Sequence, residues 1–569
     1  MELKDKIMMF ALENAIKFNG RANPGAIIGK ILSSDPELKK DMKTVSRQIQ
    51  EIIKEVNSMD LESQKKLYEE VAPKDRKEKK KEIKQKQKEI KHELPDLPNA
   101  VQGKVVTRLP PEPSKYNHIG HAISFLINYM YAKKYDGKCV LKFEDTNPEK
   151  SSQEFVNAMI EDLTEYLDIK PSKIALVSDL MDIMYEKAVE LIKKEKAYVC
   201  FCEREVMKDL RMKGEKCNCF DDVNKNLEEW KKMVEGKHEA GKAILRLKGD
   251  MKSNNMVMRD PVLFRINFTP HFKHKDKYVC WPLYDFENSI SDCEFGVTHI
   301  LRSSEFGEMR NELQNYIKDS LGYDKQEIIH YGRFNITGTT TKGREIRELI
   351  ASGEVSGWDD PSLVTLKALK RRGIKKEVLY DLVYEAGMSL NSKKIDWTVI
   401  SSISRKILDK KADRYFFIEN PKKITVNNSP NQNIELDKHP EMKEKGVRNF
   451  ETKDEFFITK NDFDNIRDGS LIRMMDCVNF KKTGDSYEFH SLDYEEYKKE
   501  GRAIIQWLPA NENNVEVEIR MPDNQIVKGL GEKTISDLKV DDIIQFQRFG
   551  FCRLDNIIDG KYEFWFTHK

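Results

Sequence analysis

The chain has 569 residues, 34% of them charged, yet its formal net charge is only +2 at pH 7. This length predicts several domains, and the balanced charge allows basic surface only as local patches. No apolar run is long enough to cross a bilayer, and the N-terminal residues lack the pattern of a secretory signal. We therefore expect a cytoplasmic protein. Its nine cysteines suit metal ligation or free thiols better than a disulfide framework.

The first 72 residues predict a helical accessory domain. Apolar residues recur at helical spacing in residues 7–16 and again in residues 42–56, with a turn at Asn23-Pro24-Gly25 between them. Residues 73–98 follow as a charged linker. Their first part is almost entirely Lys and Glu, so it cannot bury a core.

The stretch from Lys104 to His121, KVVTRLPPEPSKYNHIGH, concentrates the residues suited to chemistry. It predicts a short strand at 105–107, a proline-rich turn, and a helix that starts near His118 and stops at Gly137. A helix N-terminus presents free N–H groups and the positive end of the helix dipole, so it suits phosphate. The two histidines, three residues apart, could donate to one polyphosphate. The alternative for a single histidine is capping or partial burial.

This string resembles the HIGH signature of class I aminoacyl-tRNA synthetases, and Arg108 with the Pro-Pro-Glu-Pro run resembles the glutamyl/glutaminyl branch of that class. The resemblance implies a multidomain protein with an α/β Rossmann-type catalytic core, whose first half spans residues 99–199. It also implies ATP, carried with Mg²⁺, as the cofactor. The ATP-binding residues implied within this string are Pro111, His118, Ile119, Gly120 and His121.

Carboxylates follow the next predicted strand, Cys139 to Phe143, in the string Glu144-Asp145-Thr146-Asn147-Pro148. Open α/β sheets bind ligands beyond the carboxyl ends of their strands, so these side chains are candidates for substrate contact. The alternative is an N-cap, which suits Asp145 or Thr146. The string resembles the FEDT-N-P segment of the family. The resemblance implies that Glu144 faces the amino group of the substrate.

Residues 200–280 predict an insertion between the two halves of the nucleotide fold. Two C-x-C pairs can supply four thiolates to a tetrahedral zinc ion, and we expect such a structural zinc in preference to four unligated thiols. The expected ligands are Cys200, Cys202, Cys217 and Cys219. Basic patches follow at 242–248 and 271–275. The resemblance implies that this insertion binds the acceptor end of tRNA, although surface charge alone is the simpler reading for any single lysine.

The second half of the nucleotide fold, predicted at 281–345, supplies further substrate residues. Tyr284 and Asn288 share a helical face, and Arg302 follows an apolar strand. A glutamate site must pair a carboxylate, which an arginine does bidentately with support from a tyrosine hydroxyl. Two arginines suit an anionic substrate better than a neutral amide. From these patterns and the resemblance, the expected glutamate-binding residues are Arg108, Glu112, Glu144, Tyr284, Asn288 and Arg302.

The segment from Gly338 to Ile346, GTTTKGREI, departs from the KMSKS-type loop of the family. Thr replaces the usual Ser, one lysine matches the principal Lys, and Gly343 stands where a second basic residue is usual. We expect this glycine to make the loop more flexible. The resemblance implies that the lysine stabilises the departing pyrophosphate. The implied catalytic residues are His118, His121 and Lys342. The implied ATP contacts in the loop are Thr341, Lys342 and Arg344.

Residues 346–413 predict a helical connective domain, whose GWDDP and TLKALKRRG segments closely resemble the next segment of the same branch. From 414 to 569 the apolar period changes to two, which predicts short strands and β-barrels. The predicted strands are 414–418, 456–459, 486–490, 503–507, 515–519 and 543–551. The resemblance implies that this all-β region binds the anticodon.

End to end, the chain resembles archaeal-type glutamyl-tRNA synthetases. The resemblance implies ATP-dependent activation of L-glutamate to glutamyl-adenylate, followed by transfer to the 3′ end of tRNA-Glu. Three alternatives stay open: a glutaminyl-tRNA synthetase, a non-discriminating enzyme that also charges tRNA-Gln, and an inactive tRNA-binding protein. The altered KMSKS-like loop is the only support for the last of these.

Overall fold

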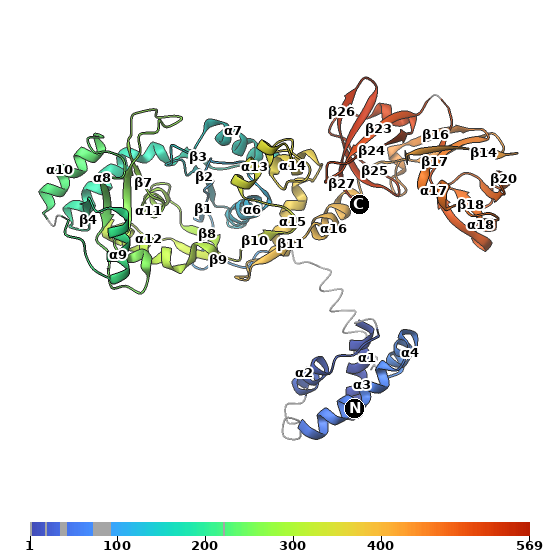
Figure 1. Cartoon of the computed structure of the whole chain (residues 1–569), viewed down its shortest axis with the longest axis horizontal. Coiled ribbons are helices and arrows are strands. Elements are labelled where there is room, and N and C mark those ends of the chain that lie inside the picture. The colour runs from blue at the N-terminus through green and yellow to red at the C-terminus, as the bar shows by residue number, and fades with distance from the viewer. Residues whose placement is uncertain (1–2, 18–19, 35–41, 72–92, 220–221, 512) are drawn as a thin grey trace. The chain divides into compact units, whose positions relative to one another are not determined.

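The computed structural model describes residues 3–17, 20–34, 42–71, 93–219, 222–511 and 513–569. The chain divides into two compact units, residues 1–91 and residues 92–569 (Figure 1). Most of the predicted linker, residues 73–92, lies outside the described residues. Among the helices that are described, none combines the length and apolar character needed to span a membrane.

The first unit is helical, as predicted. Its described helices are α1 (Leu3–Lys17), α2 (Pro24–Ser34), α3 (Met42–Asn57) and α4 (Leu61–Val71). The apolar stripes of α1 and α3 form one buried core with α2. The buried amide of Gln64 on α4 donates to the carbonyls of Val56, at 2.8 Å, and Gly20, at 3.0 Å, which satisfies both acceptors away from water.

The second unit begins with a parallel sheet, as an α/β nucleotide fold requires. Strands β1 (Val106–Leu109), β2 (Lys138–Phe143) and β3 (Lys173–Leu176) are parallel neighbours, and β8 (His299–Ser303) pairs with β9 (Glu327–Tyr331) in the same sense. Hydrogen bonds in both directions between Val106 and Thr298 place β8 beside β1. The sheet order is therefore β3-β2-β1-β8-β9, and the loops after β1, β2 and β8 open at one edge.

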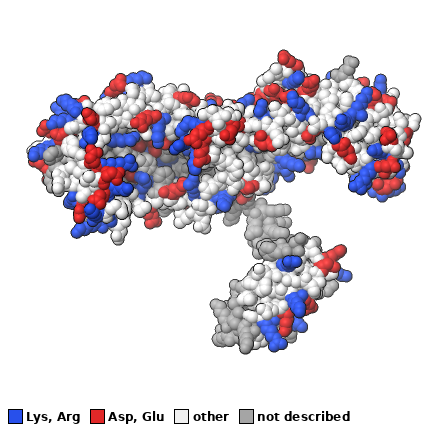
Figure 2. Space-filling model, viewed as in Figure 1, with Lys and Arg blue, Asp and Glu red and all other residues white. Residues whose placement is uncertain are grey.

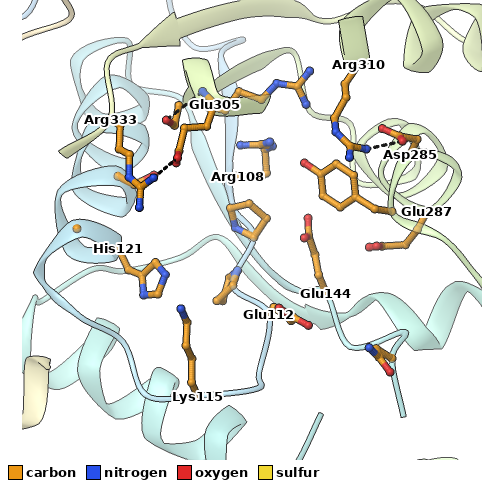
Figure 3. A pocket seen from close by; sticks show the side chains of 18 of the residues that line it. Arg108, Glu112, Lys115, His121, Glu144, Asp285, Glu287, Glu305, Arg310 and Arg333 are labelled. Atoms are coloured by element: carbon orange, nitrogen blue, oxygen red, sulfur yellow. Dashed lines mark hydrogen bonds and ion pairs between the residues drawn. The ribbon is translucent and has the colours of Figure 1, made fainter. Parts of the chain in front are cut away.

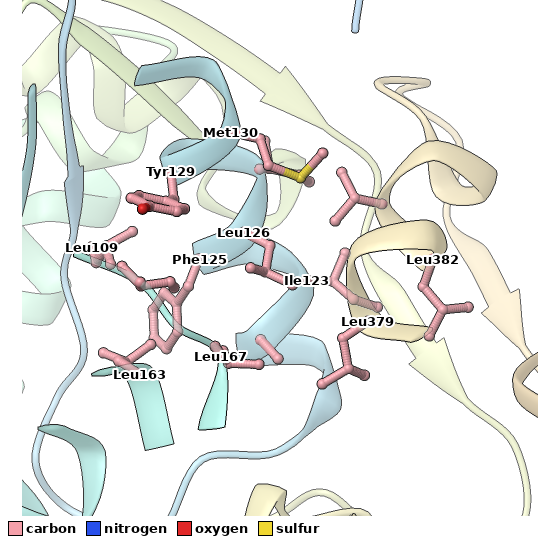
Figure 4. Close-up of a cluster of buried hydrophobic side chains, with 14 of the residues drawn as sticks. Leu109, Ile123, Phe125, Leu126, Tyr129, Met130, Leu163, Leu167, Leu379 and Leu382 are labelled. Carbon is pink, nitrogen blue, oxygen red and sulfur yellow. The ribbon is translucent and has the colours of Figure 1, made fainter. Parts of the chain in front are cut away.

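Helix α6 (Ile119–Lys134) crosses from β1 to β2 and is enclosed by apolar side chains. Ile123 and Leu126 lie towards Leu379 and Leu382 of α15 (Lys376–Ala386), and further residues of the helix pack against Leu109 (Figure 4). Burial on both sides fixes the helix axis, and with it the position of the N-terminus that the histidines occupy.

The end of α6 differs from the prediction. The helix stops at Lys134, and Asp136 takes the left-handed conformation (φ 48°) expected of Gly137. Gly137 serves another purpose, because a Cβ there would lie 2.0 Å from the carbonyl oxygen of Val105. Glycine is needed at position 137 because the chain there enters β2 in close contact with another backbone segment. The residue that takes the left-handed turn conformation is Asp136.

Between the two halves lies an antiparallel sheet in the order β4-β5-β6-β7, which gives the predicted insertion its own core. Its strands are β4 (Ala197–Cys200), β5 (Ile244–Leu247), β6 (Val262–Ile266) and β7 (Cys280–Pro282). Helices α8 (Met181–Lys193), α10 (Val223–Val234), α11 (Tyr284–Glu294) and α12 (Gly307–Leu321) contribute to that core, and α9 (Arg204–Lys213) lies in the connection between β4 and β5. Helix α7 (Gln153–Glu161) belongs instead to the core of the parallel sheet, through Val156 and Met159. The sheet begins at Ala197, ahead of the predicted boundary at residue 200.

The connective region joins the catalytic core to the β-rich region. Its elements are β10 (Phe334–Ile336), α13 (Gly343–Ser352), α14 (Leu366–Arg371), α15, β11 (Lys393–Ile395) and α16 (Trp397–Leu408). Short strand β11 interrupts the predicted helical run because it pairs in parallel with β10. Arg371 bonds Asp555 at 2.7 Å, and Arg372 donates to the carbonyl of Thr567 at 3.0 Å, so the RRG segment contacts the C-terminal strands directly.

The C-terminal region contains two seven-stranded sheets, each nearly closed. One has the order β12-β25-β26-β27-β23-β24-β13 and the other β21-β18-β19-β20-β14-β17-β22. The edge strands of the first are separated only by Phe416, and those of the second only by residues 506–507, so each sheet returns to its starting edge. This confirms the predicted barrels. A buried ion pair of 2.6 Å joins Glu532, which follows the last residue of β24 in the first sheet, to Arg448, which lies on the separate two-stranded sheet β15-β16.

Strand bounds in the first sheet are Arg414–Tyr415, Ile543–Phe546, Gly550–Ile558, Lys561–His568, Val515–Arg520, Ile526–Gly531 and Phe417–Glu419, in the order given above. Those in the second are Gly501–Ile505, Leu471–Met474, Asn479–Thr483, Ser486–Ser491, Pro421–Asn427, Glu455–Thr459 and Leu508–Pro509. The remaining elements are β15 (Gln432–Asp437), β16 (Val447–Thr452), α17 (Lys460–Asn465) and α18 (Tyr494–Glu500).

The single strand predicted at 543–551 is wrong, because the chain reverses within it. Strands β25 and β26 are antiparallel neighbours, and the turn between them places Arg548 at φ 60° and Gly550 at φ 154°. The sequence FQRFGF alternates as a strand would, and an arginine gives no turn signal. The strand predicted at 414–418 is likewise divided into β12 and β13, which belong to opposite edges of one sheet.

Candidate active site

A cavity of about 1110 Å³ lies at the edge of the parallel sheet where β1, β2 and β8 end (Figure 3). Its walls come from the β1–α6 turn, the segment after β2, the start of α11, the end of β8 and residues 333–342. Sequence segments more than 200 residues apart therefore contribute to one site, at the position expected for ligands of an open α/β sheet.

The four residues of the HIGH segment, His118 to His121, each have a different structural role at the start of α6. His118 is the N-cap and accepts a hydrogen bond at Nδ1 from the Gly120 amide, at 3.1 Å, while His121 accepts at Nδ1 from the His118 amide, at 3.3 Å. Ile119 is fully buried in the core, and its own amide bonds Val364. A Cβ at Gly120 would lie 3.0 Å from His118 Cε1, so glycine leaves room for the imidazole ring.

Both imidazoles are neutral donors towards the cavity. Burial lowers the pKa of His118 to about 3, and burial together with its neighbour His118 lowers that of His121 well below the usual value. Since each Nδ1 accepts a backbone hydrogen bond, each proton sits on Nε2. The rings are stacked with centroids 3.8 Å apart. His118 is the N-cap that precedes the first helical residue, so the capping role left open as an alternative is the one that it takes.

The loop before α13 reaches the opposite rim of the cavity. Thr341 and Lys342 line the rim, but the Lys342 ammonium bonds Glu345 of its own helix at 2.6 Å, and its side chain is 74% exposed. Arg344 is more exposed still and bonds Glu348 at 2.9 Å, away from the cavity lining. Helix α13 itself is anchored by Ile346, which is buried against the GWDDP segment.

The arginines predicted for glutamate lie at the inner end of the cavity. Arg108, on β1, and Arg302, at the end of β8, are both nearly fully buried. Arg302 donates to the amide oxygens of Gln314, at 3.1 Å, and Asn311, and these two side chains orient the guanidinium. Burial raises the pKa of the Tyr284 hydroxyl, which therefore stays protonated beside Arg302. This pair can present positive charge and an O–H group to one carboxylate.

A buried lysine organises the carboxylates beside them. Lys142 on β2 bonds Asp292 at 2.7 Å and the Oδ1 of Asn288 at 2.9 Å, and it lies 3.7 Å from Glu144. Asp292 also lies 3.6 Å from Arg108. Burial raises the pKa of Glu144, whereas Lys142 and Arg108 oppose that shift. Glu144 lines the cavity, but Asn288 lies behind the lining and its Nδ2 donates to the Tyr284 carbonyl at 3.2 Å.

Of the remaining predicted residues, Glu112 and Pro111 line the cavity, and the Pro111 carbonyl accepts from the Glu144 amide at 2.9 Å. Eleven of the fourteen residues predicted for catalysis, ATP or glutamate line this cavity, and Ile119, Asn288 and Arg344 lie outside the lining. Their predicted roles as direct contacts stay predictions.

Sequence reasoning missed several lining residues. Lys115 and Glu287 come from a proline-rich turn and from a helix interior, where neither carries a motif signal. The ion pairs Arg310–Asp285 and Arg333–Glu305 also line the cavity (Figure 3). Only the proximity of Lys115 to the HIGH segment in sequence could have singled it out.

The four cysteines predicted as metal ligands form a cluster at the end of β4. All four Sγ atoms lie within 4.8 Å of one another, with pairs at 3.7–3.9 Å. A tetrahedron with Zn–S bonds of about 2.3 Å has S···S edges of about 3.8 Å. Arg246 Nη1 donates towards Cys200 and Cys217, as groups around a thiolate-bound metal commonly do.

Three family models match successive parts of the chain. Residues 104–410 match the catalytic domain of "tRNA synthetases class I (E and Q)", and residues 412–494 and 504–555 match two anti-codon binding domains of the same description. Glutamate–tRNA ligases of Pyrococcus furiosus and Methanocaldococcus jannaschii are 39% and 36% identical to this chain, and each match covers 100% of both chains.

A crystal structure of a glutamate tRNA ligase from Elizabethkingia meningosepticum is 18% identical and covers 54% of this chain and 70% of its own, with a TM-score of 0.38. That likeness adds nothing to the sequence matches, which span the whole chain. On those matches, the chain belongs to the glutamyl and glutaminyl (E and Q) class I tRNA synthetases.

Proposed function

We propose that this protein is a glutamate–tRNA ligase that activates L-glutamate with ATP and transfers it to the 3′ end of tRNA-Glu. One observation carries the proposal: two buried arginines and a neutral histidine pair at a helix N-terminus line the same cavity. The two arginines suit a dicarboxylic amino acid, and the histidine pair at the helix N-terminus suits a polyphosphate.

For glutamate, the buried charges define an orientation. Arg302 and Tyr284 pair the side-chain carboxylate, while Glu144 accepts from the α-ammonium. Arg108 and Lys142 oppose the rise in the pKa of Glu144, which favours its ionised form. Glutamine would place a neutral amide against Arg302 and would lose the charge-assisted, bidentate pairing that a carboxylate makes, so glutamate is the preferred substrate.

For ATP, His118 and His121 each offer one N–H to phosphate oxygens at the dipole end of α6. The α-carboxylate of glutamate attacks the α-phosphorus, the bond to the bridging oxygen breaks, and pyrophosphate leaves with its Mg²⁺. Lys342 stabilises the charge that develops on that leaving group once its bond to Glu345 is exchanged for phosphate. Positioning and charge stabilisation therefore supply most of the rate.

For tRNA, the two nearly closed sheets are the proposed anticodon reader, and the antiparallel insertion receives the acceptor end. Basic and acidic side chains are interspersed over the face seen in Figure 2, so binding relies on local contacts rather than on net charge. Charging of tRNA-Gln by the same enzyme stays an open alternative.

The cysteine cluster is proposed to hold one structural Zn²⁺. Its four thiolates would close the coordination shell, tie the end of β4 to the loop after α9, and leave no open position for chemistry. Elemental analysis of the purified protein should find one zinc per chain and none in a Cys217→Ser/Cys219→Ser variant. A wild-type protein that folds fully without metal would contradict this assignment.

The test of the activity is ATP–pyrophosphate exchange with glutamate or glutamine, each with and without tRNA-Glu. Exchange supported by glutamate and not by glutamine is expected. Exchange with glutamine instead would identify a glutaminyl enzyme. Binding of tRNA without exchange for either amino acid would indicate the inactive tRNA-binding protein.

A further inference from the structure

Lys115 lies in the turn between β1 and α6, three residues before the HIGH N-cap, and its side chain lines the cavity. Figure 3 shows its ammonium end directed into the cavity on the side of His121. It is also one of the charges that lower the pKa values of His118 and His121. The ammonium therefore lies at the same helix end as the two imidazoles.

This ammonium has no counterion among the residues that the structure describes. Glu112 is the nearest carboxylate that favours its charged form, but the two make no ion pair within 4 Å, and Arg347 acts in the opposite sense. Burial lowers the pKa of Lys115 below its ordinary value. Arg333, the other cation near His118, is already paired with Glu305. An anion bound beside Lys115 would supply the missing counter-charge.

Gly343 makes this position of the lysine possible. It is the buried first residue of α13, and a Cβ there would lie 2.9 Å from Cδ and 3.2 Å from Cβ of Lys115. Its φ is not in the left-handed region, so nothing in the backbone requires glycine. Glycine at position 343 leaves space for the Lys115 stem, which explains why this residue has no side chain. The gain in loop flexibility expected from the sequence is not needed as an explanation.

We propose that Lys115 is an ATP-binding residue that contacts the polyphosphate beside His118 and His121, and that Gly343 is small because the Lys115 stem occupies the space above it. The proposal rests on the ATP site proposed above and adds a cation to it. Both imidazoles are neutral, and Lys342, at the rim, is bonded to Glu345. Lys115 is thus a cation already in place when ATP arrives, whereas Lys342 must first leave Glu345.

Lys115→Met separates charge from packing, because methionine keeps an unbranched stem over Gly343 and removes only the ammonium. Isothermal titration of the full-length protein with ATP should show about ten-fold weaker binding, as expected for loss of one charged contact. Adenosine, which lacks phosphates, should bind as it does to the wild type. Lys115→Arg should retain most of the affinity for ATP. Lys133→Ala, an exposed site at the far end of α6, is the matched control.

A second pair of variants tests the link to Gly343. Gly343→Ala should displace the lysine stem and weaken ATP binding several-fold in the wild type. In a Lys115→Ala background only the Cβ contact at 3.2 Å remains, so the same substitution should have a much smaller effect. Equal effects of Gly343→Ala in both backgrounds would overturn the steric part of the proposal.

Unchanged ATP affinity in Lys115→Met would overturn the assignment, and so would equal weakening of ATP and adenosine, which indicates a structural defect. These outcomes are distinct from failure of the proposed function. In that case the wild-type protein itself would fail to bind ATP or to catalyse exchange.

Discussion

At the inner end of the cavity the charged side chains are buried and held by several partners each, whereas at the rim the principal lysine is exposed and bonded to its own helix. Arg108, Lys142 and Asp292 have almost no solvent contact, and Lys342 has most of its side chain in water. Buried, partnered groups have their geometry fixed before the substrate binds. Exposed ones can change partner during the reaction. The comparison separates the residues proposed to recognise glutamate from the lysine proposed to act as pyrophosphate leaves.

The two kinds of ion pair also differ in what they contribute to stability. The Lys142–Asp292 pair is fully enclosed and tied to Asn288 and Ser291, so removing either partner leaves a charge in a medium that solvates it poorly. The Lys342–Glu345 pair is solvated, and breaking it costs little. That small cost is consistent with the proposed transfer of the loop lysine from Glu345 to phosphate.

The largest expected effect comes from breaking the buried network. Asp292→Ala leaves Lys142 and Arg108 without their shared carboxylate, and we expect a loss of about 3–5 kcal/mol in the free energy of unfolding. Urea denaturation followed by tryptophan fluorescence measures it. Asp319→Asn, which removes an exposed pair with Lys325, is the control and should change stability by less than about 1 kcal/mol. Similar losses in both variants would erase the difference between buried and exposed pairs.

Lys342→Ala should come next. We expect kcat for ATP–pyrophosphate exchange to fall about 10²–10³-fold, as for loss of one preorganised group that stabilises charge in the transition state. The KM for ATP should change much less, because the lysine is bonded elsewhere before the reaction. Equal losses in ATP binding and in rate would count against this role. Arg344→Ala, whose side chain points away from the cavity, is the matched control for charge in the loop.

Arg302→Gln should act on binding instead. The glutamine keeps a polar side chain but removes the charge, so we expect the KM for glutamate to rise about one-hundred-fold. Arg302→Lys should recover only part of this loss, since an ammonium cannot pair a carboxylate bidentately. Steady-state exchange at varied glutamate concentration gives the answer, and a normal KM in the glutamine variant would exclude Arg302 from the substrate carboxylate.

The smallest expected effect is on the pH dependence of stability, through His118 at the N-terminus of α6. The unfolded chain binds a proton at His118 near pH 6.5, but the native protein does so only near pH 3, so stability should fall as pH drops below 6.5. The slope for one such group is at most about 1.4 kcal/mol per pH unit. His118→Asn keeps an N-cap side chain and should show a shallower loss between pH 7.5 and 5.5 in urea denaturation. An identical slope in both proteins would mean that His118 titrates normally in the folded state.

The residues of the cavity could not all be identified equally well from the sequence. Arg302 and Glu144 could be placed because each follows an apolar strand, and the cysteines because their spacing limits what they can do. Lys142 and Asp292 could not be assigned to the site from the sequence. One is a lysine inside an apolar strand and the other an aspartate inside a helix, and only the packing of α11 against the sheet shows that they pair. Asn288 carries the right helical spacing, but only the packing shows that it supports Lys142 from behind the cavity wall. The turn at Arg548 was missed because its residues alternate as a strand does.

The most direct test of the account compares Arg302→Gln and Lys342→Ala in one exchange assay, with kcat and both KM values measured for each. The account predicts a raised glutamate KM with kcat nearly unchanged for the first variant. It predicts a lowered kcat with both KM values nearly unchanged for the second. Loss of the same parameter by a similar factor in both variants would contradict the division between a recognition end and a catalytic rim.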